Sequence, residues 1–241
     1  IYKWTTEIGL VTANQHVYEG TDDMQNCSRI NHLQWTNNHA EFTEGAALMY
    51  KVVSAAIAVH KSEHTDVLQS NASQNWTDIV TGFVNASSIF QGDDGALVEV
   101  ACENNGKCDT DQRAFKGIAA RSFARTAQVA PIVADSIHAM LNASAKGAAQ
   151  NCKGNDNNVT CRLTWSSSSK GTWEQNTVAD GNLGEVLNAL SAVQALLWST
   201  VGSVNGTAGS ASPDATTSGS PSGTSGSPQS TGAASTLAAS F

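Results

Sequence analysis

Apolar residues recur every three to four positions along much of the chain, and this spacing limits the folds open to it. The pattern is clearest over residues 76–90 and 186–197, where one helix face would be apolar and the other polar. Further helices are expected over 41–62, 110–127 and 131–149, the last entered through a proline that suits a first turn. No segment shows a convincing run of the two-residue alternation typical of half-buried strands. The sequence therefore predicts an all-α domain whose helices are joined by polar loops.

The composition changes abruptly near the C-terminus. From Asn205 to Phe241, 25 of 37 residues are Gly, Ser, Thr or Pro, and Asp214 is the only charged residue. Such a segment lacks the apolar surface needed to offset the entropy of ordering, and its composition is typical of an O-glycosylated stalk. We therefore divide the chain into a domain at residues 1–202 and a disordered Ser/Thr/Gly-rich tail at residues 203–241.

The chain is acidic and carries few charges. It has 13 Lys and Arg against 21 Asp and Glu, a formal charge of −8, and only 14% of its residues are charged, where about 25% is usual. The basic patch expected of a protein that binds nucleic acid or an anionic membrane surface is missing. No uninterrupted apolar run reaches the roughly 18 residues needed to cross a bilayer. We expect a monomer that binds no nucleic acid.

Four of the cysteines form two closely spaced pairs. Cys102 and Cys108 bracket the segment ENNGK, and Cys152 and Cys161 bracket KGNDNNVT, both rich in residues that favour turns. Each pair can close a small loop as a local disulfide, whereas neither has the tight C-x2-C spacing of most zinc sites. Cys27 is left over, which indicates a partner outside this chain.

Acceptor sequences for N-glycosylation, Asn-x-Ser/Thr, are frequent. None has proline in the middle position, and together with the paired cysteines they favour a secreted, glycosylated eukaryotic protein. The acceptor asparagines are Asn26, Asn71, Asn75, Asn85, Asn142, Asn158 and Asn205. Asn75 and Asn85 fall within a predicted helix, so not every site need be used.

Two kinds of motif have residue types suited to hydrolytic chemistry. The adjacent carboxylates Asp22-Asp23 and Asp93-Asp94 are of the type that glycosidases use, but both lie in turn-like segments, which favours solvated loop carboxylates. The H-x-x-E-H pattern at residues 60–64 matches a zinc-binding motif, but it lies at a polar helix end without an apparent third ligand. We therefore expect no metal and no cofactor, and the catalytic residues stay unassigned.

The segment Gln34–His39 places an indole beside amides and a hydroxyl immediately before a predicted helix. Carbohydrate sites use this mixture, because aromatic faces stack on the C–H surfaces of sugars, amides bond sugar hydroxyls, and a helix start adds backbone donors. The alternative is a capped helix start with Trp35 in the core. Trp35 and Asn38 are therefore candidate substrate-binding residues.

A longer block around this segment resembles a known family. The stretch YEGTDDMQNCSRINHLQWTNNHAEFTEGAALMYK is similar to the Y-[DE]-G…N-C…QWTYN-x-G…GAA-x-[ML]-Y block of the fungal branch of glycoside hydrolase family 76. Residues 108–116 resemble that family's C-x-x-DQ-x-FK segment, and residues 152–165 resemble part of its closing portion. The likeness spans about residues 2–200.

This resemblance implies an (α/α)6 barrel that acts on α-1,6-linked mannose, as a mannan endo-1,6-alpha-mannosidase or as a transglycosidase that attaches GPI-linked proteins to wall glucan. The substrate would be α-1,6-mannan or the GPI core glycan, with cell-wall glucan as the acceptor in transfer. The resemblance adds Asp111 and Gln112 to the candidate substrate-binding residues, with helix capping by Asp109 or Asp111 as the alternative.

The resemblance also implies that part of the family domain is missing. The family's catalytic residues are an adjacent Asp-Asp pair within a segment like N-D-D-Q-x-x-W, and this sequence has no such segment. Asp22-Asp23 aligns with a later block, so the catalytic role cannot be carried over to it. Because the chain starts with Ile1 rather than Met, we expect the C-terminal half of the domain, with Cys27 bonded to the other half.

The sequence departs from the family pattern at several positions. Asn37 replaces an aromatic residue, Ala40 replaces a glycine, and Glu41 and Glu44 replace apolar residues. The alternative to an enzyme is therefore a non-catalytic, stalked cell-surface glycoprotein or a degenerate carbohydrate-binding paralogue. Both alternatives place the protein at the cell surface or wall. A GPI anchor to the plasma membrane fits the small-residue tail, although the closing STLAASF is too weakly apolar to complete its signal.

Overall fold

The computed structural model describes residues 1–59, 66–155, 158–169 and 183–199. The H-x-x-E-H pattern at 60–64, the acceptor Asn205 and the tail at 203–241 lie outside these residues. The boundary between domain and tail therefore stays a prediction.

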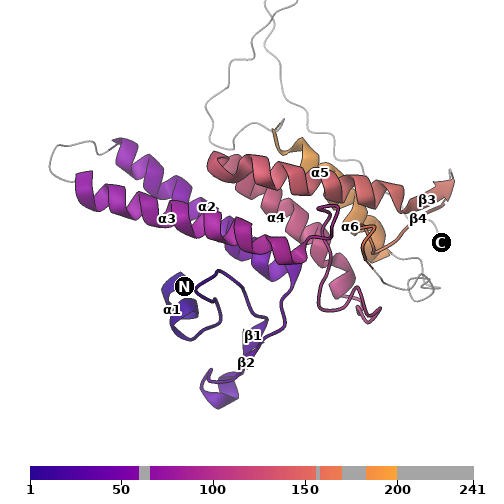
Figure 1. Cartoon of the computed structure of the whole chain (residues 1–241), viewed down its shortest axis with the longest axis horizontal. Helices are drawn as coiled ribbons and strands as arrows, with labels where there is room; N and C mark the ends of the chain where they lie inside the picture. Colours follow the sequence, from indigo (N-terminus) through magenta and orange to yellow (C-terminus); the bar gives the residue numbers. More distant parts are fainter. Residues whose placement is uncertain (60–65, 156–157, 170–182, 200–241) are drawn as a thin grey trace, which may run out of the picture. The chain divides into compact units, whose positions relative to one another are not determined.

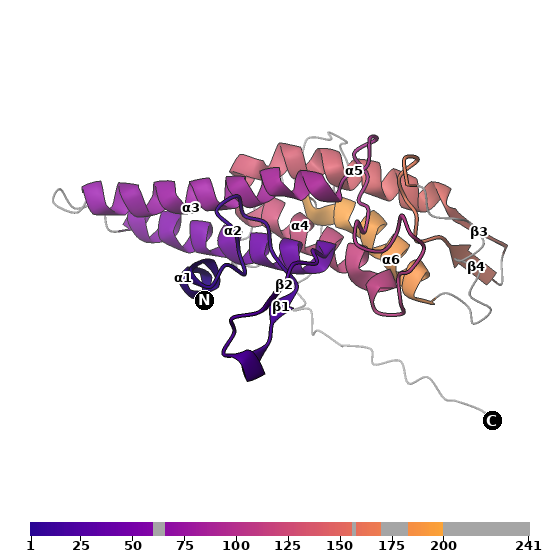
Figure 2. The same cartoon turned by 60° about the horizontal axis from the view of Figure 1, so that its bottom comes forward.

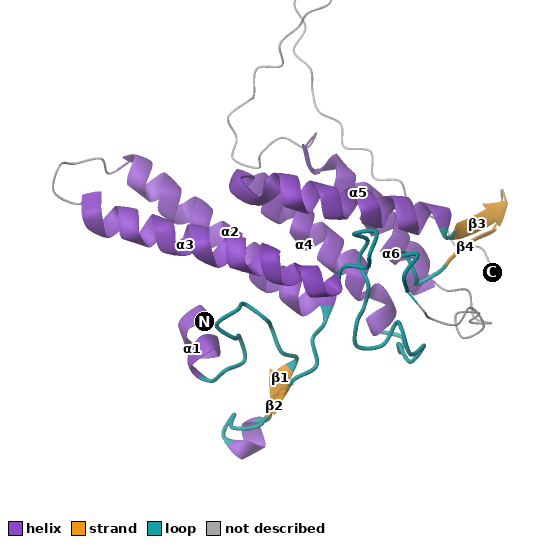
Figure 3. Ribbon diagram, in the orientation of Figure 1, coloured by secondary structure: helices purple, strands orange, loops and turns teal. Residues whose placement is uncertain are grey.

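Helices dominate the described residues (Figure 3). The α-helices are α1 (Tyr2–Glu7), α2 (Thr36–Val59), α3 (Asp66–Ala86), α4 (Phe115–Val129), α5 (Ala134–Gln150) and α6 (Leu183–Gln194). Short 3-10 helices are η1 (Asp23–Gln25), η2 (Ser87–Phe90), η3 (Gln112–Ala114), η4 (Pro131–Val133) and η6 (Ala195–Ser199). This confirms the predicted all-α class. Within the described residues, no helix combines the length and the apolar character that a membrane span requires.

Two small antiparallel hairpins interrupt the helices. β1 (Gly20–Thr21) pairs with β2 (Ile30–Asn31), and β3 (Cys152–Asn155) pairs with β4 (Asn158–Cys161). The second hairpin sets Cys152 opposite Cys161, and their disulfide closes it. Strands this short give no recognisable alternation of apolar and polar residues, so the sequence pattern did not predict them.

The long helices form antiparallel pairs that lie side by side (Figure 1, Figure 2). α3 runs antiparallel to α2, and α5 runs antiparallel to α4. α6 packs against α4 and α5. Since alternate helices run in the same direction, α2, α4 and α6 begin at the same end of the helical unit. A ring contact between Trp35 and Phe115 and an ion pair between Arg113 and Glu185 hold these three starts together.

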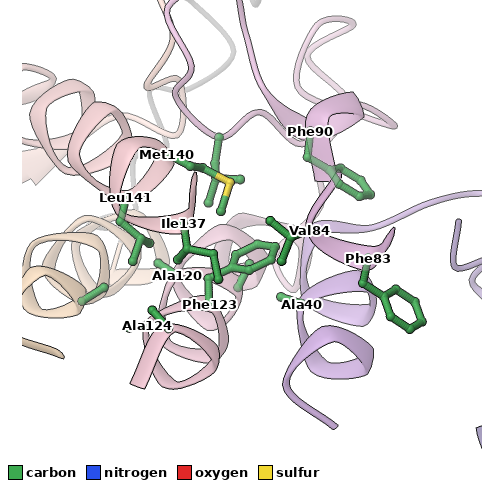
Figure 4. Close-up of a cluster of buried hydrophobic side chains, with 14 of the residues drawn as sticks. Ala40, Phe83, Val84, Phe90, Ala120, Phe123, Ala124, Ile137, Met140 and Leu141 are labelled. Carbon is green, nitrogen blue, oxygen red and sulfur yellow. The ribbon is translucent and has the colours of Figure 1, made fainter. Parts of the chain in front are cut away.

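The core lies between the helix pairs (Figure 4). Phe83 from α3, Phe123 from α4, and Ile137 and Leu141 from α5 are fully buried there. Burial of a side chain of this size contributes about 1.5–3 kcal/mol to folding. Small residues such as Ala120 fill the places where the helices come closest.

Gly117 brings the starts of α4 and α6 together. A Cβ atom at this position would lie 2.9 Å from the Cα atom of Asn188 on α6. The Gly117 N–H also donates to the side-chain carbonyl of Asn188. A larger residue would push the two helix starts apart.

α6 buries a different face from the one that its apolar spacing suggests. Its buried face carries small and polar residues: Glu185, Asn188, Ala189, Ser191 and Ala192. In contrast, Leu183, Leu187 and Leu190 keep 67%, 50% and 48% of their surface exposed. The small face fits closely against α4, so the leucine stripe is left on the outside of the described residues.

Candidate functional site

The predicted substrate-binding residues come to the end of the helical unit where α2, α4 and α6 begin. Trp35 and Asn38 lie at the start of α2, and Asp111 and Gln112 lie just ahead of α4. Helix starts carry backbone N–H groups without intrahelical partners, which suit the oxygens of a sugar. We call this end the site end, and we define it by residues 34–38, 109–115 and 183–188.

Trp35 is buried at the site end. Its side chain is 5% exposed, and its ring packs edge-on against Phe115 with 5.6 Å between ring centroids. The Cys102–Cys108 disulfide and Leu163 complete this small apolar cluster. Within the described residues, Trp35 therefore has the position expected of a core residue. A contact of Trp35 with a sugar stays a prediction.

Glu19 orients the indole of Trp35. The Trp35 Nε1–H donates to Glu19 Oε1 at 2.8 Å, and the side-chain amide of Asn31 donates to the other carboxylate oxygen. Sequence reasoning did not select Glu19, although it is the acidic residue of the Y-[DE]-G block. This hydrogen bond joins the β1–β2 hairpin to the start of α2.

Amide side chains surround the first turn of α2. Asn38 is half-buried there, as are its neighbours Gln34 and Asn37. Among the described residues, Gln34 Oε1 and Asn37 Oδ1 are buried without a hydrogen-bond partner. Because they are buried, neither oxygen is open to a ligand in this arrangement.

His39 belongs to the core rather than to the site surface. It is fully buried, and its Nε2 atom lies 2.8 Å from the carbonyl oxygen of Phe83. Burial lowers the pKa of His39 to about 4. The bond to Phe83 acts against this decrease, and the charge of His16 adds to it. His39 is therefore neutral at pH 7.

Asp109 and Gln112 cap the turn ahead of α4. The Gln112 N–H donates to Asp109 Oδ1 at 3.2 Å, and the Asp109 N–H donates to Gln112 Oε1 at 3.1 Å. This reciprocal pair has the form of a capping box. The capping alternative therefore applies to Asp109 and Gln112, whereas Asp111 has an exposed side chain and makes no side-chain cap bond. Asp111 is the freer of the two predicted residues to meet a ligand.

An ion pair joins the starts of α4 and α6. Arg113 Nη1 lies 3.0 Å from Glu185 Oε1, and the Glu185 side chain is 2% exposed. Arg113 Nε also donates to the carbonyl oxygen of Cys108 at 3.3 Å. The pair thus fixes the disulfide loop, the turn ahead of α4 and the start of α6 relative to one another.

A second ion pair is fully buried behind the site end. Lys116 Nζ lies 2.8 Å from Glu103 Oε2, donates to the Leu163 carbonyl oxygen at 2.6 Å and lies 4.3 Å from the ring centre of Trp165. Burial lowers the pKa of Lys116, and the carboxylate of Glu103 opposes this. The other oxygen of Glu103 accepts a bond from Ser169 at 3.0 Å.

Glu99 caps the start of α2 from a distant part of the chain. Its Oε2 atom accepts from the Thr36 hydroxyl at 2.6 Å, and its Oε1 atom accepts from the Thr36 N–H at 3.1 Å. Burial raises the pKa of Glu99 to about 7, against the opposing effects of the Thr36 bonds and the Lys116 charge. No local motif marks Glu99, since its partner lies 63 positions away.

One carboxylate of each adjacent pair has structural contacts in its loop. Asp22 caps η1. It accepts from the Met24 N–H at 2.9 Å and from the side-chain amide of Gln25. Asp94 accepts from the hydroxyls of Ser166 and Ser167 at 2.7 Å and 2.9 Å. Partial burial raises the pKa of Asp94, but these bonds outweigh it and lower the value to about 2. Among the described residues, no three His, Cys, Asp or Glu side chains are grouped to hold a metal ion.

A cavity of about 810 Å³ lies beside the C-terminal half of α5. Asn142 and Lys146 line it from the helix, and Arg162 and Trp165 line it from the segment after β4. Asn142 is also a predicted glycosylation site. The cavity shares Trp165 with the buried ion pair of Lys116, but it contains none of the predicted substrate-binding residues.

Both predicted disulfides are present, Cys102–Cys108 and Cys152–Cys161. Cys27 is a free, half-buried thiol in a turn. Four acceptor asparagines are exposed: Asn26, Asn75, Asn85 and Asn142. The side chains of Asn71 and Asn158, like Asn205, lie outside the described residues. Glycosylation at these sites stays a prediction.

The departures from the family pattern fall in different places. Asn37 lies at the site end, whereas Ala40 is fully buried in the core. Glu41 is exposed further along α2, and Glu44 pairs with Arg125 at 3.0 Å. Of these four changes, only Asn37 alters the site end.

Known proteins are similar to this chain in sequence and in the arrangement of their helices. The sequence profile of glycosyl hydrolase family 76 matches residues 1–207. Over 201 residues the chain is 30% identical to mannan endo-1,6-alpha-mannosidase DFG5 of Saccharomyces cerevisiae, covering 82% of this chain and 38% of that protein. It is 33% identical to mannan endo-1,6-alpha-mannosidase DCW1 of Eremothecium gossypii, covering 81% of this chain and 39% of that protein.

A solved structure extends this likeness to three dimensions. The crystal structure of Dfg5 from Chaetomium thermophilum in complex with glucosamine is similar with a TM-score of 0.66 at 27% identity, covering 83% of this chain and 45% of that chain. The helices are therefore part of an (α/α)6 barrel, as predicted. The chain spans about two fifths of the length of the curated relatives it matches. The profile match, the shared helix arrangement and the motifs at the helix starts show that the chain belongs to glycosyl hydrolase family 76.

Proposed function

We propose that this chain is the C-terminal part of a glycosidase that acts on α-1,6-mannose linkages during fungal cell-wall biogenesis. The substrate is α-1,6-mannan or the GPI core glycan, and cell-wall glucan is the acceptor if the enzyme transfers rather than hydrolyses. The observation that carries the proposal is the meeting of the Gln34–Asn38 amides and the Asp109–Gln112 turn at one end of a family 76 helical unit. The names of the relatives, mannan endo-1,6-alpha-mannosidases, support the linkage.

The chain's own residues would bind and orient the sugar. Its best-placed carboxylates already have structural partners: Glu19 holds Trp35, Glu185 holds Arg113, and Asp94 holds the Ser166 loop. We therefore assign the Asp-Asp pair that performs the chemistry to the part of the family domain outside this chain. The exposed Asp111 and the half-buried Asn38 would accept bonds from sugar hydroxyls.

The proposed location is the cell surface or cell wall, reached by secretion. The two disulfides and the exposed acceptor asparagines support an oxidising, glycosylating route. A GPI anchor to the plasma membrane and a monomeric state complete the proposal.

A sugar-binding protein without activity is the second candidate. The observation that favours it is Asn37, which takes the place of the family's aromatic residue at the site end. This change removes a stacking face but leaves the neighbouring Asn38 and Asp111 unaltered.

The experiment is a binding titration of an α-1,6-mannooligosaccharide with a complete family 76 domain that contains this chain. Asp111→Asn should weaken binding about tenfold, because a charged acceptor of a sugar hydroxyl is lost. Asp135→Asn is the matched control, since Asp135 is an exposed aspartate in the first turn of α5, at the other end of the unit. Equal affinities of Asp111→Asn and wild type would remove Asp111 from the site. A folded wild type that binds no mannooligosaccharide would contradict the proposed function.

A further inference from the structure

Glu99 is a buried carboxylate that connects the site end to the interior. It lies in the loop between η2 and η3, its side chain is fully buried, and both of its oxygens face Thr36. Thr36 is the first residue of α2 and directly follows Trp35. Glu99 therefore holds the one turn that carries both Trp35 and Asn38.

The hydrogen bonds of Glu99 suit a helix start. The N–H groups of a helix's first turn lack intrahelical acceptors, and a carboxylate there also interacts favourably with the helix dipole. A cap residue usually precedes its helix directly. Here Gln34 and Trp35 precede the helix, and neither is a preferred capping residue, so a residue 63 positions later supplies the cap.

Two charged groups face Glu99, one from its own loop and one from α4. Glu103 accepts a hydrogen bond from the Glu99 N–H at 2.9 Å, and Glu103 in turn pairs with Lys116 at 2.8 Å. The Lys116 charge favours an ionised Glu99, and the Glu103 charge disfavours it. Among the described residues, the buried Lys116 pairs with Glu103, and the Glu99 carboxylate is left with the neutral donors of Thr36.

We propose that Glu99 is a positioning residue for the sugar site, which holds Trp35 and Asn38 through Thr36 and makes sugar binding depend on pH. The inference rests on the proposed function. The ionised carboxylate accepts two charge-assisted bonds from Thr36, whereas the protonated acid is a weaker acceptor and no longer balances the helix dipole. The first turn of α2 is held more tightly in the ionised state.

The raised pKa of Glu99, about 7, places this change within an accessible range. One pH unit below that value, roughly a tenth of the carboxyl groups are ionised. Because the protonated form positions the turn less well, affinity falls below pH 7, by at most roughly tenfold for each pH unit.

The test measures the dissociation constant of an α-1,6-mannooligosaccharide by calorimetry between pH 5 and pH 8.5, in a complete family 76 domain that contains this chain. The wild type should bind more weakly below pH 7. Glu99→Gln, which keeps the shape but cannot ionise, should bind weakly at every pH. Glu44→Gln removes a carboxylate further along the same helix and should leave the pH profile unchanged.

A second variant separates positioning from a merely structural role. Thr36→Val removes the hydroxyl that stabilises the ionised form of Glu99, so it should move the midpoint of the affinity profile to higher pH. A structural loss alone would weaken binding without moving the midpoint. Circular dichroism of each variant confirms that it is folded.

The outcomes distinguish the two claims. Glu99→Gln with the affinity and pH profile of the wild type, or Thr36→Val with an unmoved midpoint, would overturn the role of Glu99 while leaving the proposed function intact. A folded wild type that binds no mannooligosaccharide at any pH would contradict the proposed function, and the inference with it.

Discussion

At the scale of single residues, the site end rests on a small number of buried charges. Glu103 and Lys116 expose 1% and 0% of their side chains, and each is the other's partner. A buried charge without its partner costs far more than an exposed one, because the interior cannot solvate it. Removing one member of the ion pair should therefore destabilise the fold strongly, because the other charge is then buried without a partner.

Replacing Lys116 with methionine should lower the free energy of unfolding by about 3–5 kcal/mol, since it leaves the Glu103 carboxylate buried and unpaired. Urea unfolding at pH 7 of a complete family 76 domain that contains this chain measures the change. Lys3→Met is the matched control: it breaks an ion pair with Glu7 in which the side chains are 88% and 60% exposed, and it should cost at most about 1 kcal/mol. Similar losses in the two variants would contradict the burial argument.

The burial of His39 should make the free energy of unfolding depend on pH. Its pKa is about 4 in the folded protein and 6.5 ordinarily, so its contribution to stability is complete above pH 6.5 and is lost as the pH falls towards 4. The loss amounts to about 3 kcal/mol. His39→Gln keeps a donor for the Phe83 carbonyl but does not titrate. The difference in unfolding free energy between wild type and variant should therefore shrink between pH 7 and pH 4.

Glu99 titrates over part of the same range, and its raised pKa has the opposite effect on stability. Its contribution to the free energy of unfolding is present below pH 4.5 and is lost as the pH rises through 7. Because Glu99 is present in both proteins, its effect cancels in the comparison. If the unfolding free energies of wild type and His39→Gln differ by the same amount from pH 7 to pH 4, His39 is not buried as a neutral group.

At the scale of elements, the sequence predicted the long helices better than their ends. α2 was expected from residue 41 but begins at Thr36, because Glu99 supplies a cap that no local pattern contains. α4 was expected from residue 110 but begins at Phe115, after the capped turn of η3. For α6 the spacing identified the helix but not its buried face, which depends on the close approach of Gly117.

The close approach of α4 and α6 can be tested with two glycines. Gly117→Ala should lower the free energy of unfolding by about 1–3 kcal/mol, because the new methyl group would meet the backbone of Asn188. Gly45→Ala, in the middle of α2 with no atom within 4 Å of the added carbon, should raise it by up to about 1 kcal/mol through helix propensity. Thermal melting of the two variants, each in a complete family 76 domain that contains this chain, measures both changes. Stabilisation by Gly117→Ala would contradict the described packing.

At the scale of the whole molecule, the described helices leave apolar surface uncovered. α6 exposes Leu183, Leu187 and Leu190, and an apolar cavity of about 740 Å³ lies among α1, α2 and α3, lined in part by Phe42 and Trp76. Monomeric proteins rarely expose large apolar patches without a partner. We therefore expect residues 1–202 alone to melt with low cooperativity, with the thiol of Cys27 free to react.

The most direct measurement is the release of reducing sugar from α-1,6-mannan by residues 1–202, expressed with and without the rest of a family 76 domain. We predict no release by the chain alone and release by the complete domain, with Cys27 protected from thiol reagents only in the complete domain. A monomeric, cooperatively melting chain that cleaves mannan by itself would contradict the account. That result would return the catalytic role to the carboxylates present here, beginning with Asp22 and Asp23.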